Sequence, residues 1–277
     1  MDVPIRFLPT QEIAPDTFLI RQLIGEGMAP LVAPLNTMVI RGEQPVIVDT
    51  GAAVTREGWL ERAFEIVDPG DVRWVYLSHD DTDHTGAVFE VLDRAPNATV
   101  VTTWFAVERM AADAMLPLDR VRIVNPGESI DAGDRTLTAY VPPVFDSPTT
   151  RGLFDSKTGV LWGADAYGAL VPHAADDVAE FDADVFEESF VHTQRMLSPW
   201  HQWLDPAVYG AHLDGLQRLG ASVVASCHGV ALRGTQIDRA YELTRRIPGM
   251  APAPLMGQPD LDGLLAMLAA TPQAQAA

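Results

Sequence analysis

The chain has 277 residues, of which 47% are apolar, and its formal net charge at pH 7 is −19. This length predicts one domain over 1–277. The negative charge argues against nucleic acid and membrane partners, because phosphate backbones and anionic lipid heads repel an acidic surface. The sequence contains no apolar run of about 18 residues, so no transmembrane helix is predicted. The N-terminus lacks the basic start and apolar stretch of a secretory signal, and Cys227 is the single cysteine, so we expect a cytoplasmic protein without an internal disulfide.

Strands and helices are predicted to alternate along most of the chain, which indicates an α/β fold with helices flanking β-sheets. Short apolar runs predict strands over 37–41, 45–49, 73–78, 98–103, 120–124, 135–141 and 221–227, with a hairpin over 153–165. Apolar residues at helical spacing predict helices over 56–67, 84–95, 105–114, 205–219 and 235–246.

Three segments are less regular. Residues 170–204 are rich in Asp and Glu and are interpreted as an insertion or cap near a functional site. Four prolines over 248–259 indicate a linker to a last helix at 260–269, and the tail TPQAQAA at 271–277 is expected to be flexible.

The most informative motif follows the strand predicted at 73–78, where the sequence reads Ser-His-Asp-Asp-Thr-Asp-His-Thr-Gly. His79, Asp81, Asp83 and His84 place four potential metal ligands within six residues. Loops at strand ends are where α/β proteins bind ligands, and His79 with Asp81 can face one metal while Asp83 with His84 faces another. The alternative is a helix-capping loop in which Asp83 caps the next helix.

The chain resembles the metallo-β-lactamase superfamily, whose corresponding loop reads H-x-H-x-D-H. The resemblance covers about 36–230 and has further motifs in the same order, namely Asn36-Thr37 with VIVDTGA at 46–52, Gly163-Ala164-Asp165 and Cys227-His228-Gly229. It implies an αββα sandwich of two mixed β-sheets flanked by helices, in which Asp165 bridges two metals and His228 completes the set.

Two departures from the hydrolase pattern point to the flavodiiron branch of this superfamily. Asp81 stands where hydrolases have a histidine and flavodiiron proteins have Glu, and no histidine occurs between His84 and His173. The flavodiiron pattern has a His-Trp-Pro segment nineteen residues before the bridging aspartate, which corresponds here to Asp146-Ser147-Pro148. Asp146 is therefore a candidate ligand, and the alternative is an ordinary turn residue.

This alignment implies two metal sites that share Asp165. The first comprises His79, Asp81 and Asp146, and the second comprises Asp83, His84 and His228. Such an oxygen-rich set suits iron better than zinc, which favours four-coordinate His and Cys sites, although zinc and manganese remain alternatives.

The remaining candidates are expected to support the ligands from behind or to line the pocket. Asp49 is expected to organise the loop behind the metals, Thr82 to orient ligands, and Tyr167 and His201 to line the pocket or support the ligands. Cys227 is expected to belong to the core, because alternation along a strand would point it away from His228.

Two functions follow from the resemblance, and we favour the first. One is a diiron oxidoreductase or oxygen-binding protein that binds or reduces O₂, or uses it to oxidise a small molecule. We expect no flavin domain in this chain and therefore a separate electron donor, and a homodimer is an open alternative. The other is a metal-dependent hydrolase of an ester, lactone or thioester, in which a bridging hydroxide attacks a carbonyl. A non-catalytic binding protein is a third alternative.

Overall fold

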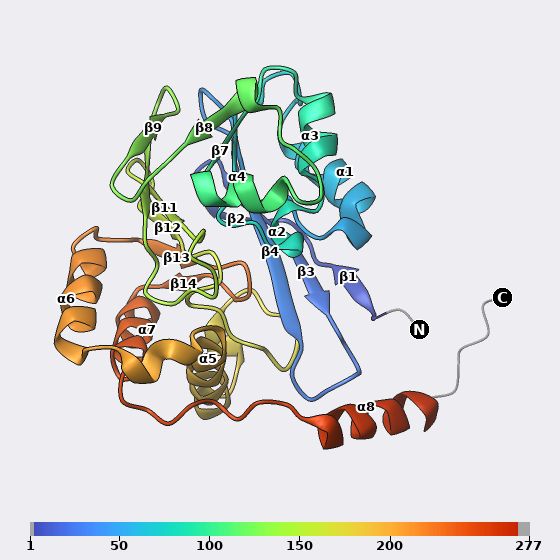
Figure 1. Ribbon diagram of the computed structural model, residues 1–277, viewed down its shortest axis with the longest axis vertical. Helices are drawn as coiled ribbons and strands as arrows, with labels where there is room; N and C mark the ends of the chain where they lie inside the picture. The colour runs from blue at the N-terminus through green and yellow to red at the C-terminus, as the bar shows by residue number, and fades with distance from the viewer. Residues whose placement is uncertain (1–2, 271–277) are drawn as a thin grey trace.

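Two β-sheets lie face to face between two groups of helices in the computed structural model, which describes residues 3–270 (Figure 1). The tail predicted at 271–277 lies outside the described residues. The first sheet has the order β1-β3-β4-β5-β6-β7-β8, with β2 paired to β3, and the second has the order β14-β13-β12-β11-β10-β9. This arrangement confirms the predicted αββα sandwich.

The elements have the following bounds. The first sheet contains β1 (Ile5–Phe7), β2 (Gln11–Ala14), β3 (Thr17–Ile24), β4 (Ala33–Ile40), β5 (Val46–Val48), β6 (Trp74–Tyr76), β7 (Thr99–Thr102) and β8 (Val121–Ile123). The second sheet contains β9 (Ser129–Asp131), β10 (Thr136–Tyr140), β11 (Gly152–Asp155), β12 (Val160–Trp162), β13 (Val223–Ala225) and β14 (Leu232–Arg233). The α-helices are α1 (Arg56–Ile66), α2 (Thr82–Thr85), α3 (Val88–Arg94), α4 (Trp104–Met110), α5 (Ala183–Leu197), α6 (Pro206–Gln217), α7 (Thr235–Arg245) and α8 (Gln258–Ala270). Short 3₁₀ helices are η1 (Ala53–Thr55), η2 (Leu118–Arg120), η3 (Val178–Glu180) and η4 (Pro199–Trp203).

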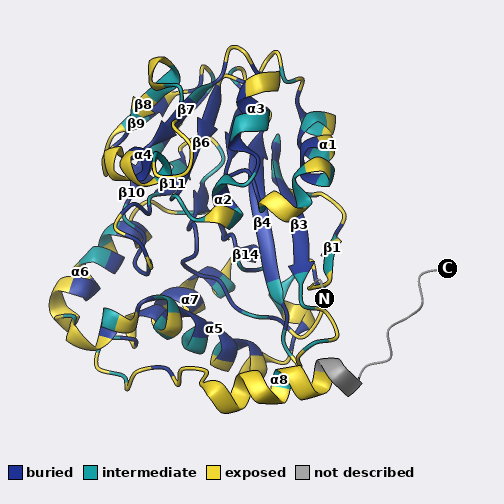
Figure 2. Ribbon diagram, turned by 45° about the vertical axis from the view of Figure 1, so that its right-hand side comes forward, coloured by how far each residue is buried: buried dark blue, intermediate teal, exposed yellow. Residues whose placement is uncertain are grey.

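The apolar strands are buried on both faces, which explains why their sequences are nearly continuous apolar runs. In β5, Val46 and Val48 belong to the apolar cluster between the two sheets, whereas Ile47 belongs to the cluster under α1 and α3. A third cluster joins the second sheet to α5, α6 and α7. Figure 2 shows this burial in the strands, whereas α8 is exposed over most of its length.

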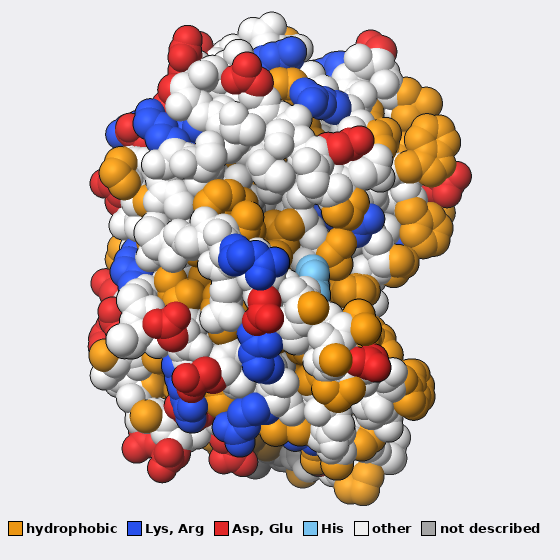
Figure 3. All heavy atoms as spheres, turned by 90° about the vertical axis from the view of Figure 1, so that its left-hand side faces the viewer, with side chains coloured by type: hydrophobic (Ala, Val, Ile, Leu, Met, Phe, Trp, Pro, Cys, Tyr) orange, Lys and Arg blue, Asp and Glu red, His pale blue; other side chains and the backbone are white. Residues whose placement is uncertain are grey.

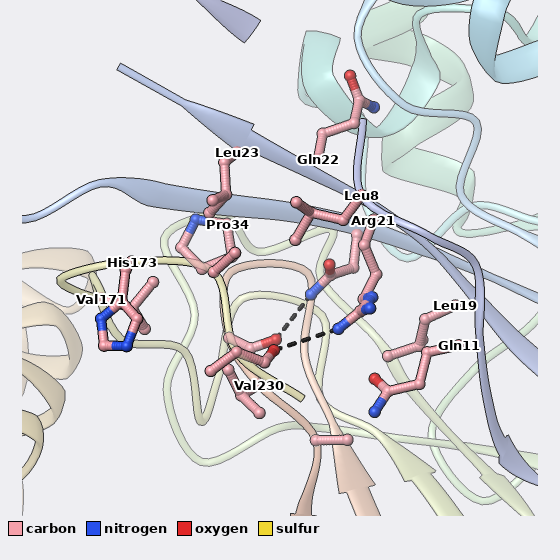
Figure 4. A pocket seen from close by; sticks show the side chains of 15 residues that line it. Leu8, Gln11, Leu19, Arg21, Gln22, Leu23, Pro34, Val171, His173 and Val230 are labelled. Atoms are coloured by element: carbon pink, nitrogen blue, oxygen red, sulfur yellow. Dashed lines mark hydrogen bonds between the residues drawn. The ribbon is translucent and has the colours of Figure 1, made fainter. Parts of the chain in front are cut away.

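The strand β3 is the longest strand that the sequence prediction missed, and β1 and β2 were missed as well. Two polar residues of β3, Arg21 and Gln22, are buried, with 7% and 1% of their surface exposed, so polar residues interrupt the apolar pattern that would indicate a buried strand. Figure 4 shows Arg21 in a pocket that His173 also lines, and its guanidinium donates to the carbonyl oxygens of Ala175 and Pro9. Buried polar groups with such partners hide a strand from a pattern based on hydrophobicity alone.

The 170–204 segment is more regular than its sequence indicates. It contains the fifteen-residue helix α5, and Phe186 and Phe190 of this helix pack in the cluster beside the second sheet. The structure contains no helix, among the described residues, that is long and apolar enough to cross a membrane. On the face drawn in Figure 3, acidic and basic side chains are interspersed.

The single helix predicted over 84–95 is wrong in one respect, because the segment forms two helices, α2 and α3, with Gly86 between them. Gly86 lies against the turn after β5, where its N–H donates to the Gly51 carbonyl at 2.7 Å. A Cβ at this position would lie 2.2 Å from the backbone nitrogen of Ala53. The close approach of these two loops interrupts the helix.

We therefore expect Gly86→Ala to destabilise the protein by about 3 kcal/mol, the upper part of the range for overpacking a buried site. Urea unfolding followed by circular dichroism measures this change. Gly215→Ala in α6 is the matched control, because a Cβ there meets no atom closer than 3.7 Å and alanine favours helix. Equal unfolding midpoints for Gly86→Ala and the unmodified protein would contradict the steric argument.

Candidate metal centre

The predicted ligands lie on loops that leave the carboxyl ends of parallel strands. In the first sheet, β5 and β6 are parallel neighbours, and they are followed by Asp49 and by the 78–84 loop. In the second sheet, β12 and β13 are parallel neighbours, and they are followed by Asp165 and His228. Because the carboxyl ends of paired parallel strands meet at one edge, residues far apart in sequence converge there.

Three buried side chains form the centre of this site. The Nε2 atom of His79 lies 3.4 Å from one carboxylate oxygen of Asp165, and the Nε2 atom of His84 lies 3.1 Å from the other. The two imidazole rings are tilted, with their centroids 3.8 Å apart. Asp165 therefore faces both histidines at once, as its predicted bridging position requires.

A second group adjoins the first on the side of β13. The Nε2 atom of His228 lies 3.4 Å from both Asp165 and Asp83, and a carboxylate oxygen of Asp83 lies 3.8 Å from the Nε2 atom of His84. The hydrogen bond to His228 and the charges of both histidines hold the pKa of Asp83 well below its usual range, despite its burial. The structure thus brings Asp83, His84 and His228 together.

The third group tests the assignment of Asp146. Ligand atoms of His79, Asp81 and Asp146 all lie within 4.8 Å of one another. Burial of the Asp146 carboxyl raises its pKa, and the nearby Asp165 carboxylate raises it further. Three acidic groups near one imidazole leave negative charge that a cation would neutralise.

The capping alternative for the motif loop is not supported. Asp81 occupies the N-cap position of α2 but makes no side-chain capping hydrogen bond, and Asp83 lies in the first helical turn facing His228. Both carboxylates are directed to the site instead.

The inner atoms of the site lack partners of their own. His79 and His84 are fully buried and Asp165 is 2% exposed, yet His79 Nε2, His84 Nε2 and Asp165 Oδ1 accept or donate no hydrogen bond among the described residues. Buried polar atoms without partners cost about 1–3 kcal/mol each. Such atoms, clustered and directed toward one another, fit the ligands of a metal ion.

The outer nitrogens of the histidines are held by hydrogen bonds. His84 Nδ1 lies 3.0 Å from a carboxylate oxygen of Asp49, and His228 Nδ1 lies 2.9 Å from the Pro34 carbonyl oxygen. His79 Nδ1 lies 3.1 Å from the Ser78 hydroxyl, which itself donates to Asp49. These partners place the ring proton on Nδ1 and leave each Nε2 lone pair free for a metal, which is the arrangement common around metal-bound histidines. Asp49 thus lies where the sequence predicted it, directly behind the ligands.

The remaining acid of the motif loop, Asp80, points away from the site. Its carboxylate forms an ion pair with Arg109 at 2.6 Å and accepts a 2.7 Å hydrogen bond from the Thr149 hydroxyl. These contacts tie the motif loop to the segment that carries Asp146. Arg109 and Thr149 were not predicted from the sequence, because their contacts with Asp80 are made by the fold and not by spacing.

A cavity of about 570 Å³ opens beside the site and is lined by Asp81, Thr82, Asp83, Phe89 and Met110, among others. Thr82 is exposed at this cavity, where a small molecule could approach the ligands. The cavity wall formed by the motif loop is polar, whereas the wall formed by Phe89 and Met110 is apolar.

The two predicted pocket residues on the helical side are buried. Tyr167 is 2% exposed and its ring contacts Tyr241, 5.7 Å away, within the cluster beside α7. His201 is 1% exposed, and its Nδ1 atom lies 2.9 Å from the Ser198 carbonyl oxygen. The Ser198 hydroxyl forms hydrogen bonds with the backbone of Phe145, which precedes Asp146. His201 is therefore connected through Ser198 to the segment that carries Asp146, whereas Tyr167 packs in the core.

The orientation predicted for Cys227 is wrong. The residue is fully buried, as expected, but its sulfur lies within 4.8 Å of ligand atoms of Asp83, His84 and His228. The strand β13 ends at Ala225, so Cys227 belongs to a turn, and strand alternation does not separate it from His228.

The sequence relatives of this chain are named as diflavin flavoproteins and flavorubredoxins. Over 238 residues it is 30% identical to the putative diflavin flavoprotein A 3 of Nostoc sp.. This alignment covers 81% of this chain and 40% of that protein. It is 24% identical to the anaerobic nitric oxide reductase flavorubredoxin of Salmonella typhi, over 74% of this chain and 43% of that protein. The chain thus spans about two fifths of the length of these relatives.

Solved structures show the same fold. The flavodiiron protein from Giardia intestinalis matches 87% of this chain and 60% of its own, with a TM-score of 0.73 and 19% identity. The rubredoxin oxygen:oxidoreductase from Desulfovibrio gigas matches 86% of this chain and 61% of its own, with a TM-score of 0.70 and 18% identity. The model of the ODP family of beta-lactamases matches residues 33–229, close to the 36–230 core inferred from the motifs. The chain belongs to this ODP beta-lactamase family, and it shares its fold with the flavodiiron protein from Giardia intestinalis.

Proposed function

We propose that this chain is a non-haem diiron protein that binds or reduces a small oxidant, O₂ or nitric oxide. The observation that carries the proposal is the chemical composition of the assembled set, which contains four carboxylates and only three imidazoles (His79, Asp81, Asp83, His84, Asp146, Asp165 and His228). Oxygen-rich sets suit iron and manganese, which accept five or six ligands, better than four-coordinate zinc.

The names of the relatives support the same choice of substrate. One is called a nitric oxide reductase and a structural neighbour is called an oxygen:oxidoreductase. Reduction of either molecule consumes electrons, so the proposal includes an electron donor, for which the flavin-containing relatives suggest a flavin or a small redox protein.

Each ligand has a defined place in the proposal. His79, Asp81 and Asp146 would hold the first metal, Asp83, His84 and His228 would hold the second, and Asp165 would be shared between them. A pair of ferrous ions held there would supply two electrons at short range to a diatomic molecule.

The surrounding residues keep this site in one arrangement. Asp49, Ser78 and the Pro34 carbonyl hold the imidazole protons on Nδ1, so that each Nε2 faces inward. The cavity beside Asp81 and Asp83 gives a small molecule access, while the buried inner atoms of His79 and His84 remain shielded from bulk water.

Metal content and oxygen response test the function directly. Protein expressed with both iron and zinc supplied is expected to contain two irons per chain by elemental analysis. The anaerobically reduced protein is expected to gain a near-ultraviolet or visible absorption band on exposure to O₂ or nitric oxide. Two zinc ions per chain with no response to either gas would overturn the proposal and favour a metal-dependent hydrolase.

Asp165→Ala tests the bridging assignment. This variant is expected to lose both metals, because Asp165 lies within 3.4 Å of the Nε2 atoms of His79, His84 and His228. Asp131→Ala removes an exposed carboxylate on β9 and serves as the control that keeps both metals. A full metal complement in Asp165→Ala would show that this residue does not bridge.

Asp146→Ala distinguishes a ligand from a turn residue. We expect one metal to be lost and the other retained, because Asp146 groups only with His79 and Asp81. Elemental analysis after dialysis measures the remaining occupancy. If both metals stay bound with unchanged affinity, Asp146 has only a turn role.

A further inference from the structure

The turn after β13 holds Cys227 in a fixed position. Its N–H donates to the Ala164 carbonyl at 2.8 Å, and its carbonyl accepts from the Asn36 N–H at 2.7 Å. The Asn36 side chain donates to the carbonyls of Ser226 and Gly229 on either side. The backbone on both sides of the thiol is therefore bound to the first sheet and to the Asp165 loop, which limits the directions in which the sulfur can point.

The sulfur lies among side chains that are already candidates for the second metal. Ligand atoms of Asp83, His84, Cys227 and His228 are all within 4.8 Å of one another. Independently, the Nε2 atom of His84 is fully buried and has no hydrogen-bond partner among the described residues. A buried imidazole nitrogen without a partner, beside a buried thiol, a second imidazole and a carboxylate, supplies the nitrogen, sulfur and oxygen donors that hold divalent metals in proteins.

We propose that the Cys227 sulfur is a ligand of the metal held by Asp83, His84 and His228, an inference that rests on the proposed two-metal function. The two metal positions then differ in chemistry. Apart from the shared Asp165, the first has one imidazole and the carboxylates of Asp81 and Asp146, whereas the second has two imidazoles, the carboxylate of Asp83 and a thiolate.

This difference has a consequence for metal selection. Thiolate and imidazole donors bind zinc, cobalt and other softer divalent ions tightly, whereas carboxylates suit harder ions. The second position is therefore the one that fills first when a divalent metal is limiting, and the first position is the one that discriminates for iron or manganese.

The competing role for Cys227 is that of a small apolar residue in the core. It belongs to the apolar cluster between the sheets, and buried free cysteines often act only as small hydrophobic groups. Packing and metal ligation make different spectroscopic predictions, since only ligation creates a sulfur–metal charge-transfer band.

Cobalt titration of the metal-free full chain tests the proposal. Because Cys227 is the only cysteine in the sequence, any sulfur-to-cobalt band belongs to it. The first equivalent of Co²⁺ is expected to produce an intense near-ultraviolet charge-transfer band. Cys227→Ala is expected to abolish the band and to weaken the binding of this first ion at least about tenfold. Loss of a group that only supports a metal ligand already lowers metal affinity by about tenfold or more, so loss of a ligand should lower it at least as much.

Two further variants keep the test independent of folding. Cys227→Ser preserves the size of the side chain and should also lack the band, while Ser226→Ala alters the same turn, retains the sulfur and should keep the band. Circular dichroism is used to check that each variant is folded. If Cys227→Ala cannot be obtained in folded form, the spectrum of the unmodified protein still decides the question.

The outcomes separate this inference from the proposed function. Unmodified protein that binds two Co²⁺ ions without the band overturns the assignment of Cys227 and leaves the diiron proposal intact. A band that persists in Cys227→Ala also overturns the assignment. Protein that binds no cobalt at all overturns both.

Discussion

The buried carboxylate of Asp49 connects the parts on which the site depends. It is fully buried and accepts hydrogen bonds from the Ser78 N–H at 2.7 Å and the Ser78 hydroxyl at 2.8 Å. It also contacts His84 Nδ1 at 3.0 Å and accepts from the Trp162 indole N–H at 3.2 Å. An unpaired buried charge would be strongly unfavourable, so these four donors must be assembled together for the carboxylate to remain inside.

Asp49 thereby joins both sheets. Ser78 and His84 follow β6 in the first sheet, whereas Trp162 ends β12 in the second. Asp49 itself has a φ of 59°, in the left-handed region, so the chain turns sharply as it leaves β5. The strain of a non-glycine residue in this region is balanced by the hydrogen bonds that its side chain makes, and such strained positions often occur at functional sites.

The site has a rigid side and an open side. His79, His84 and Asp165 are buried, and Asp49 and Ser78 hold the two imidazoles from behind. In contrast, Asp81, Asp83 and Asp146 are partly exposed and reach the site from its rim. Arg109 and Thr149 restrain the open side through Asp80, and they link the motif loop to the segment of Asp146. The imidazoles are thus preorganised by packing, while the carboxylates of Asp81 and Asp83 border the cavity beside the site.

The sequence by itself determined the α/β class and a motif loop rich in potential metal ligands, because apolar strands and short polar motifs are local patterns. The family resemblance implied the αββα sandwich and made Asp146 a candidate ligand, and the structure places that carboxylate beside His79 and Asp81. Only the tertiary structure decided the features that depend on contacts between distant segments. Gly86 divides a predicted helix because it lies against Ala53. The strand β3 was not predicted because Arg21 is buried by polar contacts with a distant segment. Cys227 faces His84 because β13 ends two residues before it. In each case the deciding contact joins residues that are far apart in the sequence, and no local pattern of hydrophobicity or spacing relates them. For this reason the fold could be predicted, whereas the direction of individual side chains could not.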